Sequence, residues 1–152
     1  MELPEKQNIR MASEKDLPRI MEIERQSFIH QWDRHNFKEA LRDCFFVFED
    51  EKVEGFLVSC CCEVANKAII LKIAVDPESR GKGVASQLLT AALDYFKGLK
   101  IDSIEIDVDV IKAGVIRLYE KFGFKVMRIL AMDPEMFDDD ELCMMKLNLN
   151  DK

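Results

Sequence analysis

Ile73-Ala74-Val75-Asp76-Pro77-Glu78-Ser79-Arg80-Gly81-Lys82-Gly83-Val84-Ala85 joins two patterns that predict different secondary structures. Residues 69–75 form an apolar, β-branched run that ends at Asp-Pro, which is typical of a buried strand. After the glycines, apolar side chains recur at a spacing near 3.6, the period of one helix face, at Val84, Leu88, Ala92 and Phe96. The sequence therefore predicts a strand, a tight glycine turn and a helix in succession.

The turn Arg80-Gly81-Lys82-Gly83 has the composition of an anion-binding site. The first amides of a helix have no hydrogen-bond partner within the helix, and the helix dipole adds positive character there. Glycine leaves such amides accessible, and Arg80 and Lys82 add positive charge. The pattern predicts a phosphate or pyrophosphate cradle, with a merely solvated turn as the alternative. The spacing fits neither a P-loop nor the dinucleotide fingerprint, which would have a third glycine in place of Ser86.

Length and composition indicate one globular domain over residues 1–152. The chain has 152 residues, enough to bury a core, and 48% of them are apolar, too many for a disordered chain. No apolar run approaches the ~20 residues of a membrane span, and the acidic N-terminus lacks a signal-peptide core. The net charge of −7 argues against a nucleic-acid partner and suits a cationic substrate.

The cysteines favour a reducing compartment. Three of the five cysteines are consecutive: Cys60, Cys61 and Cys62. None of the five has Cys-x-x-Cys spacing or a nearby pair of histidines. Thiols in a strand are therefore expected, and neither disulfides nor metal ligands are. We expect a cytoplasmic protein without a bound metal and leave its oligomeric state open.

The remaining periodicities predict an α/β fold. Strands are expected near residues 8–11, 45–49, 53–64, 69–75, 103–110, 124–132 and 142–149. Helices are expected after Ser13, around Phe37, from Val84 to Gly98, and over 114–122. This order predicts a single mixed, mostly antiparallel sheet of about seven strands, with about four helices distributed over both faces. The unit from residue 69 to 108 is expected to be a right-handed parallel crossover.

Two motifs occur in an order shared with a known superfamily. The first is Arg-x-x-Gly-x-Ala at Arg80, Gly83 and Ala85, preceded by Ala-Val-Asp-Pro, and the second is Leu118-Tyr119-Glu120-Lys121-Phe122-Gly123-Phe124. Together they resemble the GCN5-related N-acetyltransferase (GNAT) superfamily, which implies its single-domain fold. Residues 23–28, followed by Trp32 and Phe37, look more narrowly like the enzymes that acetylate α-amines of ribosomal and other proteins. The resemblance then covers nearly the whole chain.

The resemblance implies that acetyl-CoA donates an acetyl group directly to an amine within one ternary complex. The backbone of Ile73, Ala74 and Val75 would contact the pantetheine arm. The pyrophosphate would be held by Arg80 and by backbone amides of Gly81, Lys82, Gly83, Val84 and Ala85. Lys112 stands where the superfamily has a loop asparagine. Because lysine cannot accept a hydrogen bond, it would either contact phosphate through its charge or lose that role.

The same resemblance implies an acid and a base. Tyr119 stands where these enzymes keep the tyrosine that protonates the departing CoA thiolate, and a phenol of pKa ~10 can donate to a thiolate whose acid has a pKa of about 8.5. The alternative is a core tyrosine with a locally satisfied hydroxyl. Asp107 occupies the position of the base. Its unperturbed pKa of ~3.9 requires burial or a water relay, and a solvated strand charge is the alternative.

The acceptor is less well defined. A protein α-amine has a pKa of ~8 and is partly neutral at pH 7, which suits a weak base. A small amine such as a polyamine or amino acid is the alternative, because Leu130, Ala131 and Met132 replace the tyrosine pair by which relatives grip a peptide. A non-catalytic acyl-CoA-binding module is a third hypothesis. The acidic loop 133–141 is a candidate for the acceptor side of the site, and a solvated loop is the alternative. Three side chains are further candidates for that side: His30, Trp32 and His35. For Trp32 the alternative is packing in the core between the first two helices.

Overall fold

The computed structural model describes residues 8–28, 31–62, 64–109, 113–131 and 141–149. The strands are β1 (Ile9–Met11), β2 (Phe45–Asp50), β3 (Lys52–Cys62), β4 (Lys67–Val75), β5 (Ser103–Asp109), β6 (Lys125–Ala131) and β7 (Glu141–Asn148). The helices are α1 (Leu17–Ser27), α2 (Arg34–Ala40), α3 (Val84–Gly98) and α4 (Ala113–Lys121). Short 3-10 turns, Glu14–Asp16 and Pro77–Ser79, precede α1 and follow β4. The predicted order of elements is confirmed.

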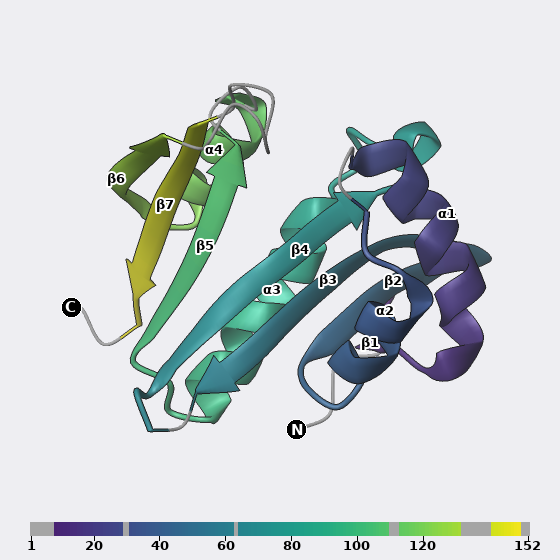
Figure 1. Cartoon of the computed structure of the whole chain (residues 1–152), viewed down its shortest axis with the longest axis horizontal. Helices are drawn as coiled ribbons and strands as arrows, with labels where there is room; N and C mark the ends of the chain where they lie inside the picture. Colours follow the sequence, from purple (N-terminus) through teal and green to yellow (C-terminus); the bar gives the residue numbers. More distant parts are fainter. Residues whose placement is uncertain (1–7, 29–30, 63, 110–112, 132–140, 150–152) are drawn as a thin grey trace.

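All seven strands form one sheet in the order β1-β2-β3-β4-β5-β7-β6. Every neighbouring pair is antiparallel except β4 and β5, which are parallel. In Figure 1, α1 and α2 lie in front of β2, β3 and β4, and α3 lies behind them. The predicted mixed, mostly antiparallel sheet with helices on both faces is therefore confirmed.

The two faces of the sheet carry separate apolar clusters. On one face, the stripe of α3 that the periodicity predicted is buried against the sheet: Val84, Leu88, Ala92 and Phe96. On the other face, α1 and α2 bury Leu17, Ile20, Ile23 and Phe37 against β2, β3 and β4. A run such as Phe45–Phe48 is apolar at every position because both of its faces are covered. Among the described helices, none is long and apolar enough to cross a membrane.

A β-bulge changes the faces of β4 halfway along the strand. Val58 pairs with Lys72 and Ser59 with Ile70, so Leu71 is the extra residue. Before the bulge Ile70 faces α3, whereas after it Ala74 joins the α1 cluster. The pairing of β4 with β5 reaches Ile70 and Ile106, and beyond this point the two strands separate (Figure 1). This separation creates the opening in which the candidate site lies.

Candidate functional site

A cavity of about 760 Å³ lies where β4 separates from β5. Four segments line it. They are the end of α1 (Gln26, Ser27, Phe28), the end of β4 (Ile73, Ala74, Val75), the glycine turn with the start of α3 (Arg80, Gly81, Ala85), and α4 (Val115, Leu118, Tyr119). The cavity therefore brings together the predicted acid and six of the predicted cofactor-binding residues. A mostly apolar cleft with a few polar groups is typical of a small-molecule site.

The glycine turn has the backbone expected of an anion cradle. Gly81 and Gly83 have φ angles of 80° and 83°, in the left-handed region that favours glycine. A Cβ built at either position meets nothing within 4 Å, so the space beside the turn is open. Gly83 caps α3 without a side-chain hydrogen bond, which leaves the first helix amides available. Val84 is 3% exposed and packs in the apolar cluster beneath α3.

Ion pairs and hydrogen bonds anchor the turn to β3 and α1. The carboxylate of Asp76 accepts the backbone N–H of Glu78 at 3.0 Å and pairs with the guanidinium of Arg19. Arg19 Nε also donates to the carbonyl of Val53 at 2.8 Å. These contacts, with the Glu78 amide contributing most, lower the pKa of Asp76 even though burial opposes them. Asp76 is therefore a buried anion that ties the turn to two other elements.

The start of α3 packs closely against the backbone of β3, and this contact sets its position. A Cβ at Gly55 of β3 would lie 2.8 Å from Cγ1 of Val84 and 3.1 Å from the carbonyl oxygen of Ala74. Glycine thus allows the first turn of α3 to pack directly on β3. Because the cradle amides belong to this turn, Gly55 helps to set their position.

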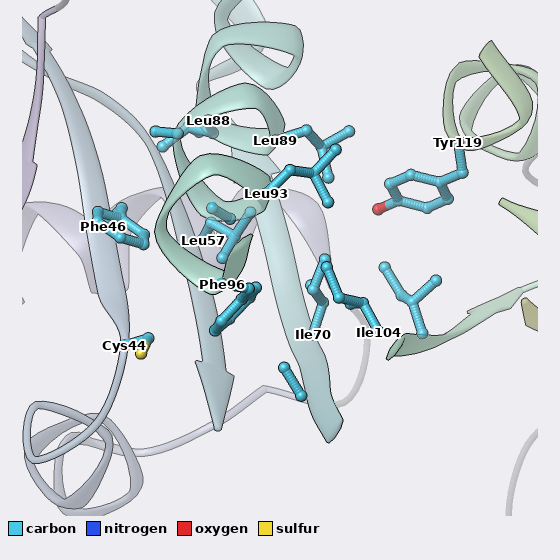
Figure 2. Packing of buried hydrophobic residues seen from close by; sticks show 14 of the residues in the cluster. Cys44, Phe46, Leu57, Ile70, Leu88, Leu89, Leu93, Phe96, Ile104 and Tyr119 are labelled. Carbon is cyan, nitrogen blue, oxygen red and sulfur yellow. The ribbon is translucent and has the colours of Figure 1, made fainter. Parts of the chain in front are cut away.

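Tyr119, on α4, is 1% exposed and belongs to the same apolar cluster as the buried face of α3. Its ring packs against Phe124 with centroids 5.8 Å apart. Figure 2 shows its hydroxyl pointing from α4 toward Leu89 and Leu93 of α3. Desolvation raises the pKa of Tyr119, so the phenol remains protonated at neutral pH. A protonated phenol beside the cavity can donate a proton.

A buried ion pair supports the wall formed by the end of α1. Lys72 Nζ lies 2.8 Å from Glu24 Oε2, and the two side chains are 8% and 1% exposed. The ammonium of Lys72 also stacks on the rings of Phe28 and Trp32, at 4.0 Å and 5.1 Å from their centroids. Trp32 donates its backbone N–H to the same Glu24 oxygen at 2.7 Å. Together these contacts hold Phe28, a cavity residue, against β4.

The other predicted residues lie outside this constellation. Asp107 is exposed on β5 and is not among the residues that line the cavity. Lys82 is exposed on the turn and is not among the residues that line the cavity. Lys112, His30 and most of the acidic loop 133–141 lie outside the described residues. His35 is exposed on α2, and Trp32 packs on Phe37 at 5.3 Å, as expected of a plug between the first two helices.

Sequence reasoning missed the supports of this site. Two signals were available: Lys72 interrupts an apolar strand, and Glu24 follows Ile20 by four residues on the buried face of α1. A charged side chain on a buried face requires a partner of opposite charge. The role of Gly55 had no local signal, because it depends on the residue that α3 brings against it.

Comparison with known proteins gives related sequences over most of the chain. Residues 17–124 match the model of the family described as Acetyltransferase (GNAT) family. An uncharacterised N-acetyltransferase of Methanocaldococcus jannaschii is 30% identical over 151 residues, which cover 95% of this chain and 94% of that protein. A second N-acetyltransferase of that organism is 32% identical over 109 residues, 66% of this chain, and the chain spans about half (48%) of that relative's length.

The names of two further relatives say more about the group that is acetylated. The N-alpha-acetyltransferase of Saccharolobus solfataricus is 29% identical over 150 residues, covering 86% of this chain and 90% of that protein. The ribosomal protein bS18-alanine N-acetyltransferase of Salmonella typhimurium is 25% identical over 119 residues, covering 76% of this chain and 79% of that protein.

Solved structures show the same fold. Ard1 from Thermoplasma volcanium superimposes with a TM-score of 0.86 at 26% identity, covering 94% of this chain and 97% of that chain. The Salmonella typhimurium protein yncA, solved with its cofactor acetyl-CoA, superimposes with a TM-score of 0.82 at 19% identity, covering 97% of this chain and 96% of that chain.

Proposed function

The chain belongs to the acetyltransferase (GNAT) family and is an N-acetyltransferase, and from that premise we propose that it moves the acetyl group of acetyl-CoA to a protein N-terminal α-amine. Transfer would be direct, within one ternary complex, by a single domain of residues 1–152. The observation that carries the proposal is the open glycine turn that shares one cavity with Tyr119. Holding two reactants in line there supplies much of the rate, since it makes the reaction effectively intramolecular.

The turn is suited to the diphosphate of the coenzyme. Backbone amides from Gly81 to Ala85 and the guanidinium of Arg80 would bind it, because an unpartnered helix start and a cation both favour an anion. Arg80 Nε donates to the carbonyl of Val75 at 3.1 Å, which places this side chain at the end of β4. The pairing of β4 with β5 ends at Ile70, so beyond it the backbone of Ile73, Ala74 and Val75 would contact the pantetheine arm along an edge of β4 that β5 does not cover.

Tyr119 is the proposed general acid. Burial keeps its phenol protonated, and Tyr119 is one of the residues of α4 that line the cavity. Asp107 is the proposed base, and its exposure means that it would act through water on an amine that arrives from solvent. An α-amine of pKa ~8 is already partly neutral at pH 7, so a weak base suffices to deprotonate it. A lysine amine of pKa ~10.4 is almost entirely protonated and requires a stronger base.

The α-amine acceptor rests on the likeness to the S. solfataricus N-alpha-acetyltransferase and the Salmonella bS18-alanine enzyme. The five cysteines are present as thiols, which supports a cytoplasmic location as part of the proposal. A small cationic amine is the other acceptor to be tested, because the tyrosine pair that would grip a peptide is replaced in this sequence.

The test is thiol release from acetyl-CoA, measured against a panel of N-terminal peptides, free amino acids and polyamines. We expect turnover with a peptide α-amine. Turnover with a polyamine alone would overturn the acceptor, and CoA binding in a calorimeter without turnover for any acceptor would overturn the enzyme.

The acid has a matched control, because the chain contains only two tyrosines. Tyr119→Phe should lower kcat by about 10²- to 10⁴-fold with CoA binding retained, as loss of a general acid does. Tyr95→Phe, on the far half of α3, should keep wild-type kcat. Equal activity of the two variants would remove Tyr119 from the mechanism.

A further inference from the structure

Three side chains with metal-binding atoms meet at a place remote from the cavity. Asp43 and Cys44 precede β2, and Cys61 lies near the end of β3. The two sulfurs are 3.9 Å apart, and one ligand atom from each of the three residues lies within 4.8 Å of the others. Figure 2 shows Cys44 and Tyr119 on opposite sides of α3. The cluster is therefore separate from the proposed active site.

Hydrogen bonds hold the cluster in place. One carboxylate oxygen of Asp43 accepts the backbone N–H of Cys44 at 2.8 Å, and the other accepts the backbone N–H of Cys61 at 3.3 Å. The carbonyl of Cys44 accepts both the backbone N–H and the hydroxyl of Ser59, each at 2.9 Å. The carboxylate thus bridges the two cysteines, and each of its oxygens retains a lone pair for a cation.

The spacing of the sulfurs suits a shared cation better than a disulfide. Two thiolates bound tetrahedrally to one metal at ~2.3 Å have sulfurs about 3.8 Å apart, close to the observed separation. A disulfide needs sulfurs ~2.05 Å apart and Cα atoms within about 7 Å. Cys44 opposes Ser59, so Cys61 is its diagonal neighbour across the strands, a relationship that puts Cα atoms about 7–8 Å apart.

We propose that Asp43, Cys44 and Cys61 form a binding site for a thiophilic divalent cation of the zinc class. Two thiolates and one carboxylate are ligands that zinc accepts, and a water molecule completes four-coordination. Binding replaces two S–H protons with two metal–sulfur bonds and releases both protons to solvent, with no change of oxidation state. The bound cation would clamp the segment before β2 to β3.

The electrostatics of the cluster agree with this assignment. Two thiolates and one carboxylate would be anionic ligands within 4.8 Å of one another, and a divalent cation among them would balance their charge.

Cobalt(II) is the probe for the test, because thiolate ligation gives it an intense near-ultraviolet charge-transfer band. Reduced, chelator-treated protein should take up one equivalent of cobalt with this band, and one equivalent of zinc should displace it. Zinc should also raise the Tm of the full chain by mass action. Cys61→Ser should lose the band and weaken zinc binding by more than the about 10- to 100-fold typical of outer-shell changes.

Cys62→Ser is the matched control, since Cys62 is exposed and, by strand alternation, faces away from Cys61. It should bind cobalt and zinc like the wild type. Equal binding by Cys61→Ser and wild type, absence of the band, or a Tm unchanged by zinc would each overturn the site. Formation of a Cys44–Cys61 disulfide by oxidised glutathione in the presence of one equivalent of zinc would also overturn it.

Discussion

The ammonium of Lys72, on β4, lies 2.8 Å from the carboxylate of Glu24, on α1, with both side chains almost completely buried. The other carboxylate oxygen, Oε1, is buried without a hydrogen-bond partner among the described residues. The pair thus joins two elements that line the cavity, at the cost of desolvating two charges. It holds the rings of Phe28 and Trp32 over the ammonium.

Removing one member of this pair should be more harmful than removing both. Lys72→Met should lower the free energy of unfolding by about 3–5 kcal/mol, because it leaves a buried carboxylate without its cation. The double variant Lys72→Met with Glu24→Leu should recover most of that loss. The measurement is denaturant unfolding of the single and double variants. A double variant as unstable as the sum of the single ones would contradict a coupled pair.

Lys67→Met is the matched control on the same strand. Lys67 pairs with Glu105 at 3.3 Å, but the two side chains are 34% and 24% exposed. Its loss should cost no more than about 1 kcal/mol. Because the Lys72 pair supports the end of α1 that lines the cavity, Lys72→Met should also raise KM for the acceptor and leave CoA affinity unchanged.

Gly55→Ala should displace the start of α3. Its Cβ would lie 2.8 Å from Cγ1 of Val84 and close to backbone at Ala74, so the helix has to move. We expect a loss of about 1–3 kcal/mol in unfolding free energy, the cost of overpacking, together with weaker CoA binding. Gly98→Ala, where a Cβ meets nothing within 4 Å, should leave both quantities close to wild type. CoA affinity that is equal in the two variants would show that Gly55 does not position the cradle.

The features of this fold that could be predicted are those set by residues close together in the sequence. The period of α3 from Val84 to Phe96 and the glycines of the turn follow from residues adjacent in sequence, and the structure has the helix and the turn where they were predicted. The superfamily motifs also placed Tyr119 beside the turn, and both line one cavity.

What could not be predicted depends on how distant segments align. The bulge at Leu71 decides that Lys72 faces α1, and no residue near it signals a bulge. The spacing of ligands along the chain gave no sign of the proposed cation site, because Asp43 and Cys44 meet Cys61 only through the pairing of β2 with β3. The alternation of β5 placed Asp107 on that strand, whereas a role as base depends on where the acceptor amine binds.

The pKa shift of Tyr119 predicts the alkaline limb of the rate profile. Burial raises the pKa of this phenol above its ordinary value near 10, so the acid stays protonated as the pH rises. We expect kcat to rise with deprotonation of the amine and to show no fall due to Tyr119 below about pH 10. The measurement is kcat against pH with a peptide acceptor. A descending limb centred near pH 8, absent in Tyr119→Phe, would contradict a buried, neutral acid.

Asp76 should make the stability of the chain sensitive to acid. Its folded-state pKa is lowered by the Glu78 amide and Arg19, so its ionised form stabilises the native state above the unfolded-state pKa of ~3.9. That contribution is lost as the pH falls through the folded-state pKa. Asp76→Asn should therefore be less stable than wild type by about 1–3 kcal/mol at pH 7, with the difference shrinking below pH ~4. Denaturant unfolding at pH 7, 5 and 3 measures it, and Asp94→Asn, an exposed change on α3, should show almost no difference at any of them. A gap between wild type and Asp76→Asn that stays constant down to pH 3 would mean that this carboxylate does not act through its charge.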